Sequence, residues 1–245
     1  MPIGIQVFTV RNELKADFKG TAKALAEMGY QGVELGSEYG GMSPRELAAF
    51  LKSVGLRVPG IHSSTVEISN PASPLYDYLA TTGARFVTVS RDRDVEKNWD
   101  ATIKEVDAAA KVAKSKGVQF TYHNHMLEFT KIGGKYALDI LFERTDPKTV
   151  QCELDTYWIK KGGEDPVSYI RKYKGRCPEI HLKDMNPSDG SFTEVGNGLM
   201  DLPAIFKVAA EVGATWMIVE QDRWTRPPME SARISIENLK KAGLA

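Results

Sequence analysis

The chain has 245 residues, with 32 basic and 32 acidic side chains and therefore no formal net charge at pH 7. Without a bulk electric field of either sign, a nucleic-acid partner and an anionic membrane surface are both disfavoured. No apolar run approaches the roughly 20 residues that cross a bilayer, and the first residues lack the basic and apolar regions of a secretion signal. The two cysteines fall in or beside predicted strands, so the sequence predicts a reduced, cytoplasmic protein.

Short apolar strands and amphipathic helices alternate along the whole chain. The predicted strands are residues 3–10, 32–37, 58–64, 85–91, 119–126, 150–157, 178–184 and 216–222. The predicted helices are residues 17–29, 43–55, 74–82, 98–117, 136–144, 165–174, 201–213 and 229–242. Such alternation favours an α/β fold with a parallel sheet. Because there is no linker and no Gly-x-Gly-x-x-Gly turn after the first strand, we expect one domain over residues 1–245, a single (β/α)8 TIM barrel.

Histidines and carboxylates gather where these strands end. All four histidines do so, and they are His62, His123, His125 and His181. Asp155 and Glu220 also close apolar strands. The carboxyl ends of barrel strands meet at one rim, where barrel enzymes build their active sites. Imidazoles together with carboxylates at that rim are typical of a divalent-metal site.

Strand parity tests this idea, because side chains alternate between the barrel interior and the helix layer. Cys152 and Leu154 are the apolar, outward set of their strand, so Glu153 and Asp155 point inward. The same reasoning turns inward Glu34, His123, His125, Glu179, His181, Lys183 and Glu220. So many ionisable groups in one confined mouth would be strongly destabilising without a cation or a hydrogen-bond network. The pattern therefore predicts a bound cation.

Other candidate residues carry a weaker signal. His62 or Glu34 alone is also typical of an ordinary polar residue inside a barrel. Trp158, like Trp216 and Trp224, suits either a core aromatic or a flat surface on which a sugar ring packs. The loop 185–201, between the seventh strand and its helix, either connects the two or closes over substrate, and its length favours a lid.

Seven segments with distinctive sequences follow one another along almost the whole chain. They are IGIQVFTVRNEL, GVEL, YHNHMLEF, ELDTYWIKKGGEDPVSYI, EIHLKD, EVGNGLMDLPAIF and IVEQD. Together they resemble the xylose-isomerase-like barrels of the sugar phosphate isomerase/epimerase family, in the variant with a His-Asn-His-x-x-Glu pattern. The resemblance implies one divalent metal ion, either Mn²⁺, Co²⁺, Mg²⁺ or Zn²⁺, held by side chains from strands five to eight.

The resemblance also implies a ligand set. Asp155, His181 and Glu220 carry over directly as metal ligands. Strand five departs from the family, whose epimerases place a glutamate there. In those epimerases this glutamate and the last metal ligand act as acid and base on opposite faces of the substrate. This chain offers no carboxylate until Glu128, which the pattern assigns to the metal. The alternatives to Glu128 are His123, His125 and Glu153.

Such a site can remove a proton next to a carbonyl. A divalent ion that binds a substrate hydroxyl and carbonyl withdraws charge and stabilises the enediolate that forms, and an imidazole of nearly neutral pKa suits the base. The expected catalytic residues are His125, Glu220, His123 and Lys183. The expected substrate-binding residues are His62, Glu34, Trp158 and Lys183.

The sequence thus predicts a divalent-metal-dependent isomerase or epimerase of a keto-sugar or related polyol, acting through an enediolate intermediate. One alternative is a lyase acting by β-elimination, in 3-keto-glycoside deglycosylation or inosose-type dehydration, because the same enediolate supports it. Another is a catalytically idle barrel that binds a sugar. The expected partner is a small-molecule sugar rather than nucleic acid or a membrane, and a homo-oligomer is an open option.

Overall fold

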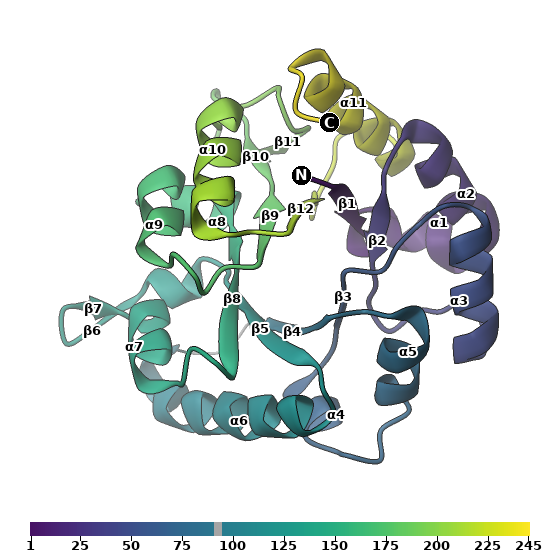
Figure 1. The fold of residues 1–245 in the computed structure, drawn as a ribbon. Helices are drawn as coiled ribbons and strands as arrows, with labels where there is room; N and C mark the ends of the chain where they lie inside the picture. Colours follow the sequence, from purple (N-terminus) through teal and green to yellow (C-terminus); the bar gives the residue numbers. More distant parts are fainter. Residues whose placement is uncertain (91–94) are drawn as a thin grey trace.

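Parallel strands form a closed ring in the computed structural model, which describes residues 1–90 and 95–245 (Figure 1). In ring order they are β2 (Gly32–Glu34), β1 (Ile3–Gln6), β12 (Trp216–Val219), β9 (Glu179–Leu182), β8 (Val150–Asp155), β5 (Gln119–His123), β4 (Phe86–Ser90) and β3 (Gly60–His62). Bridges from Gly32 to Arg57 and from Leu35 to Ile61 join the two ends of this 8-stranded sheet. The predicted (β/α)8 barrel is confirmed.

A helix follows each barrel strand and packs on the outside of the ring (Figure 1). These helices are α2 (Phe18–Met28), α3 (Pro44–Ser53), α5 (Leu75–Thr82), α6 (Val95–Ser115), α7 (Ala137–Arg144), α9 (Pro166–Lys172), α10 (Leu202–Val212) and α11 (Pro228–Lys241). Short elements that were not predicted occupy the loops. They are η1 (Val7–Val10), α1 (Arg11–Ala16), α4 (Thr65–Ile68), η2 (Leu127–Phe129), β6 (Lys131–Ile132), β7 (Lys135–Tyr136), α8 (Thr156–Lys161), β10 (Asp184–Met185) and β11 (Phe192–Thr193). No helix in the described part of the chain is long and apolar enough to cross a membrane.

Two strands end earlier than predicted because a polar side chain starts the next turn. The Gln6 side chain accepts a hydrogen bond from the backbone N–H of Phe8 at 3.1 Å and so begins η1. Asp155 likewise accepts from the N–H of Trp158 at 2.9 Å and caps α8, as short carboxylates do at helix starts. The last residue of the predicted strand 85–91 lies outside the described residues.

The interior of the ring changes character along the barrel axis. Outward strand residues pack against the helices, each at most 1% exposed: Ile5, Val33, Ile61, Val87, Phe120, Leu154, Ile180 and Val219. Inside the ring, a separate apolar cluster of Phe86, Trp216 and Ile218 fills the amino-terminal end. Gly32 makes room for it, since a Cβ there would lie 2.8 Å from the Trp216 ring. Among the described strands, most of the inward charged side chains therefore lie above this plug, towards the carboxyl ends, while Glu179 pairs with Trp216 at its level.

Candidate metal centre and active site

A cavity of about 1170 Å³ opens at the carboxyl ends of the barrel strands. Its polar lining residues include His62, His123, His125, Glu220 and Asp222. Its apolar lining residues include Phe8, Met126, Leu127, Trp158 and Phe192. A pocket with an apolar wall and a few convergent polar groups is typical of a small-molecule site.

Four buried side chains at the floor of this cavity could hold one metal ion. Their ligand atoms all lie within 4.8 Å of one another, and they belong to His123, Asp155, His181 and Glu220. The Oδ2 atom of Asp155 is enclosed, with His123 Nε2 at 3.7 Å and Lys183 Nζ at 3.0 Å. Two imidazoles and two carboxylates are donors that Mn²⁺, Co²⁺ and Zn²⁺ accept. The donor set therefore fits a divalent ion, and three of its members are the ligands Asp155, His181 and Glu220 expected from the sequence.

The structure does not bring Glu128 to this group. Its carboxylate accepts hydrogen bonds from the Tyr122 hydroxyl at 2.8 Å and from the backbone N–H of His125 at 2.9 Å. The Tyr122 ring packs edge-on against Trp99 of α6, so Glu128 is held towards the helix layer. His123, one of the alternatives left open by the sequence, takes the strand-five position instead.

The two imidazoles of the cluster differ in protonation. Burial opposes a charge on His181, but Glu153, Glu34 and Glu220 outweigh burial and raise the pKa of His181 well above its ordinary value, so this ring would have to lose a proton to bind a metal ion. Burial and the neighbouring positive charge at His181 lower the pKa of His123 well below its ordinary value, so its ring is neutral, as metal binding requires. Burial raises the pKa of Asp155 to about 6. Burial acts in the same direction on Glu220, but Lys183 and His181 outweigh it and lower the pKa of that carboxyl.

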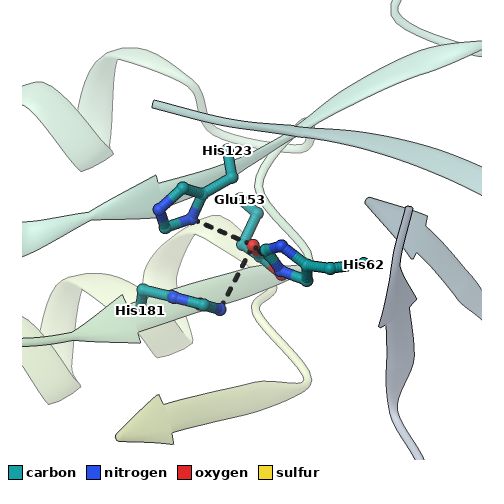
Figure 2. A group of neighbouring side chains, drawn as sticks. All are labelled: His62, His123, Glu153 and His181. Carbon is teal, nitrogen blue, oxygen red and sulfur yellow. Dashed lines mark hydrogen bonds and ion pairs between the residues drawn. The ribbon is translucent and has the colours of Figure 1, made fainter. Parts of the chain in front are cut away.

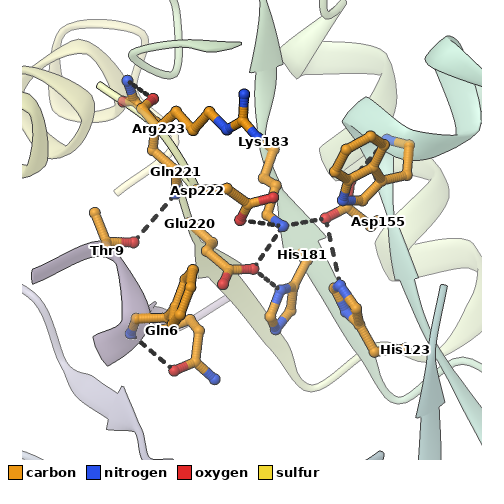
Figure 3. A network of polar contacts seen from close by, with 12 residues as sticks. Gln6, Thr9, His123, Asp155, His181, Lys183, Glu220, Gln221, Asp222 and Arg223 are labelled. Carbon is orange, nitrogen blue, oxygen red and sulfur yellow. Dashed lines mark hydrogen bonds and ion pairs between the residues drawn. The ribbon is translucent and has the colours of Figure 1, made fainter. Parts of the chain in front are cut away.

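Lys183 directly follows β9 and lies among three carboxylates (Figure 3). Its Nζ is 3.0 Å from Asp155 Oδ2, 2.8 Å from Glu220 Oε2 and 2.8 Å from Asp222 Oδ1. Burial opposes its charge, but these three carboxylates outweigh burial and raise the pKa of Lys183. At 1% exposure, Lys183 neutralises the cluster and does not border the cavity from which a substrate would approach.

A second group that shares two imidazoles with the first consists of His62, His123, Glu153 and His181, whose ligand atoms also lie within 4.8 Å of one another (Figure 2). The Oε2 atom of Glu153 is 2.9 Å from His62 Nε2, 3.0 Å from His123 Nδ1 and 3.1 Å from His181 Nε2. Glu34 Oε2 is 2.6 Å from His181 Nε2 and 3.2 Å from His62 Nε2. Glu34 is fully buried and binds these rings, so the structure does not place it where it could orient a substrate hydroxyl.

Burial disfavours a charge on His62, but the carboxylates of Glu34 and Glu153 outweigh it and raise the pKa of His62 to about 10. Its ring still borders the cavity. His125 and Trp158 also border it, as expected, with their rings edge to face at 5.5 Å. Imidazole rings and an aromatic surface therefore share one cavity.

Two members of the site were missed from the sequence. Asp222 follows Glu220 by two residues, so extending the strand alternation by one step would have found it. Gln6 donates from its Nε2 to Glu34 Oε2 at 2.9 Å, but a single amide in an apolar strand gives no signal of its own.

The loop 185–201 is tied down by one carboxylate. Asp184 accepts hydrogen bonds of 2.8–3.1 Å from four backbone N–H groups, those of Met185, Gly196, Gly198 and Met200. The strands β10 and β11 pair within the loop, and the Phe192 ring stacks on Tyr157 at 4.0 Å. The loop is thus fixed beside the cavity, which its Phe192 lines.

A closed parallel barrel with imidazoles and carboxylates at its carboxyl-terminal rim is the architecture of the sugar isomerase/epimerase-like barrels. Residues 22–242 match the model of the xylose isomerase-like TIM barrel family. The chain belongs to that family, which confirms the resemblance seen in its sequence.

Several relatives are named as enzymes. An inosose dehydratase of Clostridium beijerinckii is 26% identical over 271 residues, which cover 91% of this chain and 89% of that relative. A sugar phosphate isomerase/epimerase from Parabacteroides distasonis superposes with a TM-score of 0.84 at 23% identity, over 99% of this chain and 94% of that one. The IolI protein, solved with a zinc atom, gives 0.74 at 14% identity over 100% and 97% of the two chains. The two structures share the fold of this chain.

Proposed function

We propose that the protein is a divalent-metal-dependent lyase that removes water from a keto-sugar or keto-polyol by β-elimination. The observation that carries the proposal is the buried group of His123, Asp155, His181 and Glu220 at the floor of the cavity. These four side chains would hold the ion. When bound, a divalent ion polarises a carbonyl oxygen and makes the proton on the neighbouring carbon easier to remove.

Side chains that border the cavity would move the protons. His125 and Glu220 reach it from the ends of β5 and β12, and either can accept the proton from carbon. His62, which is protonated at neutral pH because of Glu34 and Glu153, would donate a proton to the departing hydroxyl. The C–H and C–O bonds break, a C=C bond forms, and water leaves.

The unlike character of these groups favours elimination over epimerisation. Epimerisation needs two groups that exchange the roles of acid and base on opposite faces of one carbon. Among the described residues the four-donor group contains one glutamate, Glu220, because His123 takes the strand-five position. The inosose dehydratase relatives support the same choice.

The second candidate is an isomerase or epimerase, the function that the sequence predicted first. The observation behind it is that His125 and Glu220 border one cavity from different strands, which two-sided proton exchange requires. Both reactions begin with the same proton transfer, so they differ only in their later steps.

Incubating the Mn²⁺-loaded protein with an inosose in D₂O separates these functions. Loss of one water from the substrate, seen by mass spectrometry, is the expected result. Deuterium bound to carbon without loss of water would establish the isomerase or epimerase. No exchange and no product with metal-loaded protein, for an inosose and for a 3-keto-glucoside alike, would leave a sugar-binding barrel without catalysis.

A further inference from the structure

The two ring nitrogens of His123 face two different carboxylates inside the barrel. Its Nδ1 lies 3.0 Å from Glu153 Oε2, and its Nε2 lies 3.7 Å from Asp155 Oδ2. The ring is 2% exposed, so solvent does not compete for either nitrogen. One nitrogen therefore faces a fixed carboxylate while the other faces the metal group.

We propose that Glu153 is a positioning residue, which holds His123 in the one tautomer and orientation that presents Nε2 to a metal ion. This inference rests on the proposed function, since it concerns the same metal site. The sequence analysis named Glu153 as an alternative metal ligand. In this proposal Glu153 instead orients a ligand and does not itself bind the ion.

The physical reason is the single proton of a neutral imidazole. A carboxylate that accepts a hydrogen bond from Nδ1 keeps the proton there and leaves the lone pair of Nε2 for a cation. Without that acceptor, the proton can occupy either nitrogen and the ring can turn. The carboxylate also places a negative charge directly behind a neutral ligand, which makes the ring a stronger donor.

Glu153 is itself held in place for this task. Its Oε1 accepts from the Thr88 hydroxyl at 3.4 Å, and Thr88 lies 2.7 Å from the Thr121 hydroxyl across the β4–β5 pair. In Figure 2 the rings of His62, His123 and His181 surround the same carboxylate. A side chain fixed at both oxygens can define the orientation of a neighbouring ring.

The other buried glutamates near Glu153, which are Glu34 and Glu179, do not hold the His123 ring. Glu34 Oε2 is closer to His181, at 2.6 Å, than Glu153 Oε2 is, at 3.1 Å, so His181 has its own partner. Glu179 lies near Glu34 and Glu153, but neither of its oxygens has a hydrogen-bond partner in the described part of the chain. Glu179 therefore provides a matched control for a buried glutamate of the same layer.

The test compares Glu153→Met, Glu153→Gln and Glu179→Met in the full chain. The Zn²⁺ dissociation constant, measured by competition with a chromophoric chelator, should rise roughly 10–100-fold in Glu153→Met, as for other residues that orient a metal ligand. Glu153→Gln keeps an oxygen that can accept from Nδ1, so it should recover part of the affinity. Glu179→Met should bind Zn²⁺ like the wild type.

A second readout separates positioning from a general loss of stability. The chain has 4 histidines, so selective ¹⁵N labelling resolves each ring by nuclear magnetic resonance. Zn²⁺-loaded wild type should show His123 protonated at Nδ1. Glu153→Met should lose that single tautomer and Glu153→Gln should restore it.

Unchanged Zn²⁺ affinity and an unchanged His123 tautomer in Glu153→Met would overturn the positioning role and leave the proposed metal site standing. If Glu153→Met fails to fold, Glu153→Gln alone decides through its affinity: the role predicts weaker Zn²⁺ binding than in Glu179→Met, and an equal dissociation constant would refute it. Wild type that binds no divalent ion would overturn the proposed function and this inference together.

Discussion

The outer and inner carboxylates of this barrel are neutralised by different kinds of cation. The outer cluster consists of Asp155, Glu220 and Asp222 around the ammonium of Lys183. The inner cluster consists of Glu34 and Glu153 around imidazoles, with His62 between them. Two carboxylates of the outer cluster, Glu220 and Asp222, border the cavity, whereas the inner carboxylates Glu34 and Glu153 do not.

The difference shows which cluster can exchange its cation. Lys183 has a long, flexible stem, so its charged end can move aside when another cation enters. The imidazoles of the inner cluster are short, flat and fixed on strands, so they keep their positions. The outer cluster is thus suited to binding an ion and the inner cluster to keeping the ligands in place.

Asp155→Asn should have the largest effect, because it removes one charge from the outer cluster and from the metal ligands at once. Metal affinity should fall by more than the roughly 10–100-fold typical of a residue that only orients a ligand. Elemental mass spectrometry after dialysis against Mn²⁺ measures the loss, with Asp222→Asn as the matched control. Equal metal content in Asp155→Asn and wild type would remove Asp155 from the site.

Lys183→Met should destabilise the metal-free protein. Removing one partner of a buried ion pair costs about 3–5 kcal/mol, so the variant should unfold at lower urea concentration. Mn²⁺ supplies the missing charge and should stabilise the variant more than the wild type. An equal gain for both proteins would show that Lys183 is not the counter-cation of the outer cluster.

His62 should make the inner cluster sensitive to pH. Burial opposes the charged ring, but Glu34 and Glu153 raise its pKa from 6.5 to about 10. A raised pKa contributes stability that is complete below pH 6.5 and fades as the pH rises towards 10, by about 1.4 kcal/mol per pKa unit at most. The free energy of unfolding of the metal-free protein, measured in urea between pH 6.5 and 10, should decline less steeply with pH in His62→Gln than in the wild type. Parallel profiles would assign the decline to another group.

Glu128→Ala tests a carboxylate that belongs to neither cluster, and its effect should be the smallest. It leaves the Tyr122 hydroxyl and the His125 N–H without their acceptor, which costs about 1–3 kcal/mol of unfolding free energy. Metal content should stay at the wild-type level. Loss of the metal would return Glu128 to the ligand set.

The sequence predicted the barrel because eight alternations of strand and helix leave few other arrangements. It also predicted which charged side chains point inward, since that depends on the period of two in each strand. Glu153, Asp155 and His181 follow from parity alone, and the structure places all three inside the ring.

The depth of each inward side chain along the barrel axis could not be predicted from the sequence, because it depends on how neighbouring strands are staggered. Asp155 pairs with His181, but His181 pairs with Ile218, so Glu220 lies one inward position further along its strand. Glu34 lies too deep to reach the cavity for the same reason. Glu128 follows its strand in a short 3-10 turn, whose direction strand parity does not describe.

The bonds from Asp184 to the loop 185–201 have a consequence for selectivity. A wall that is ordered before ligand arrives loses little conformational entropy on binding, so contacts with a sugar translate more fully into affinity. The same rigidity prevents the wall from adapting to a hydroxyl of the wrong configuration. Discrimination between stereoisomers would therefore be set when the chain folds, and not by closure around each ligand.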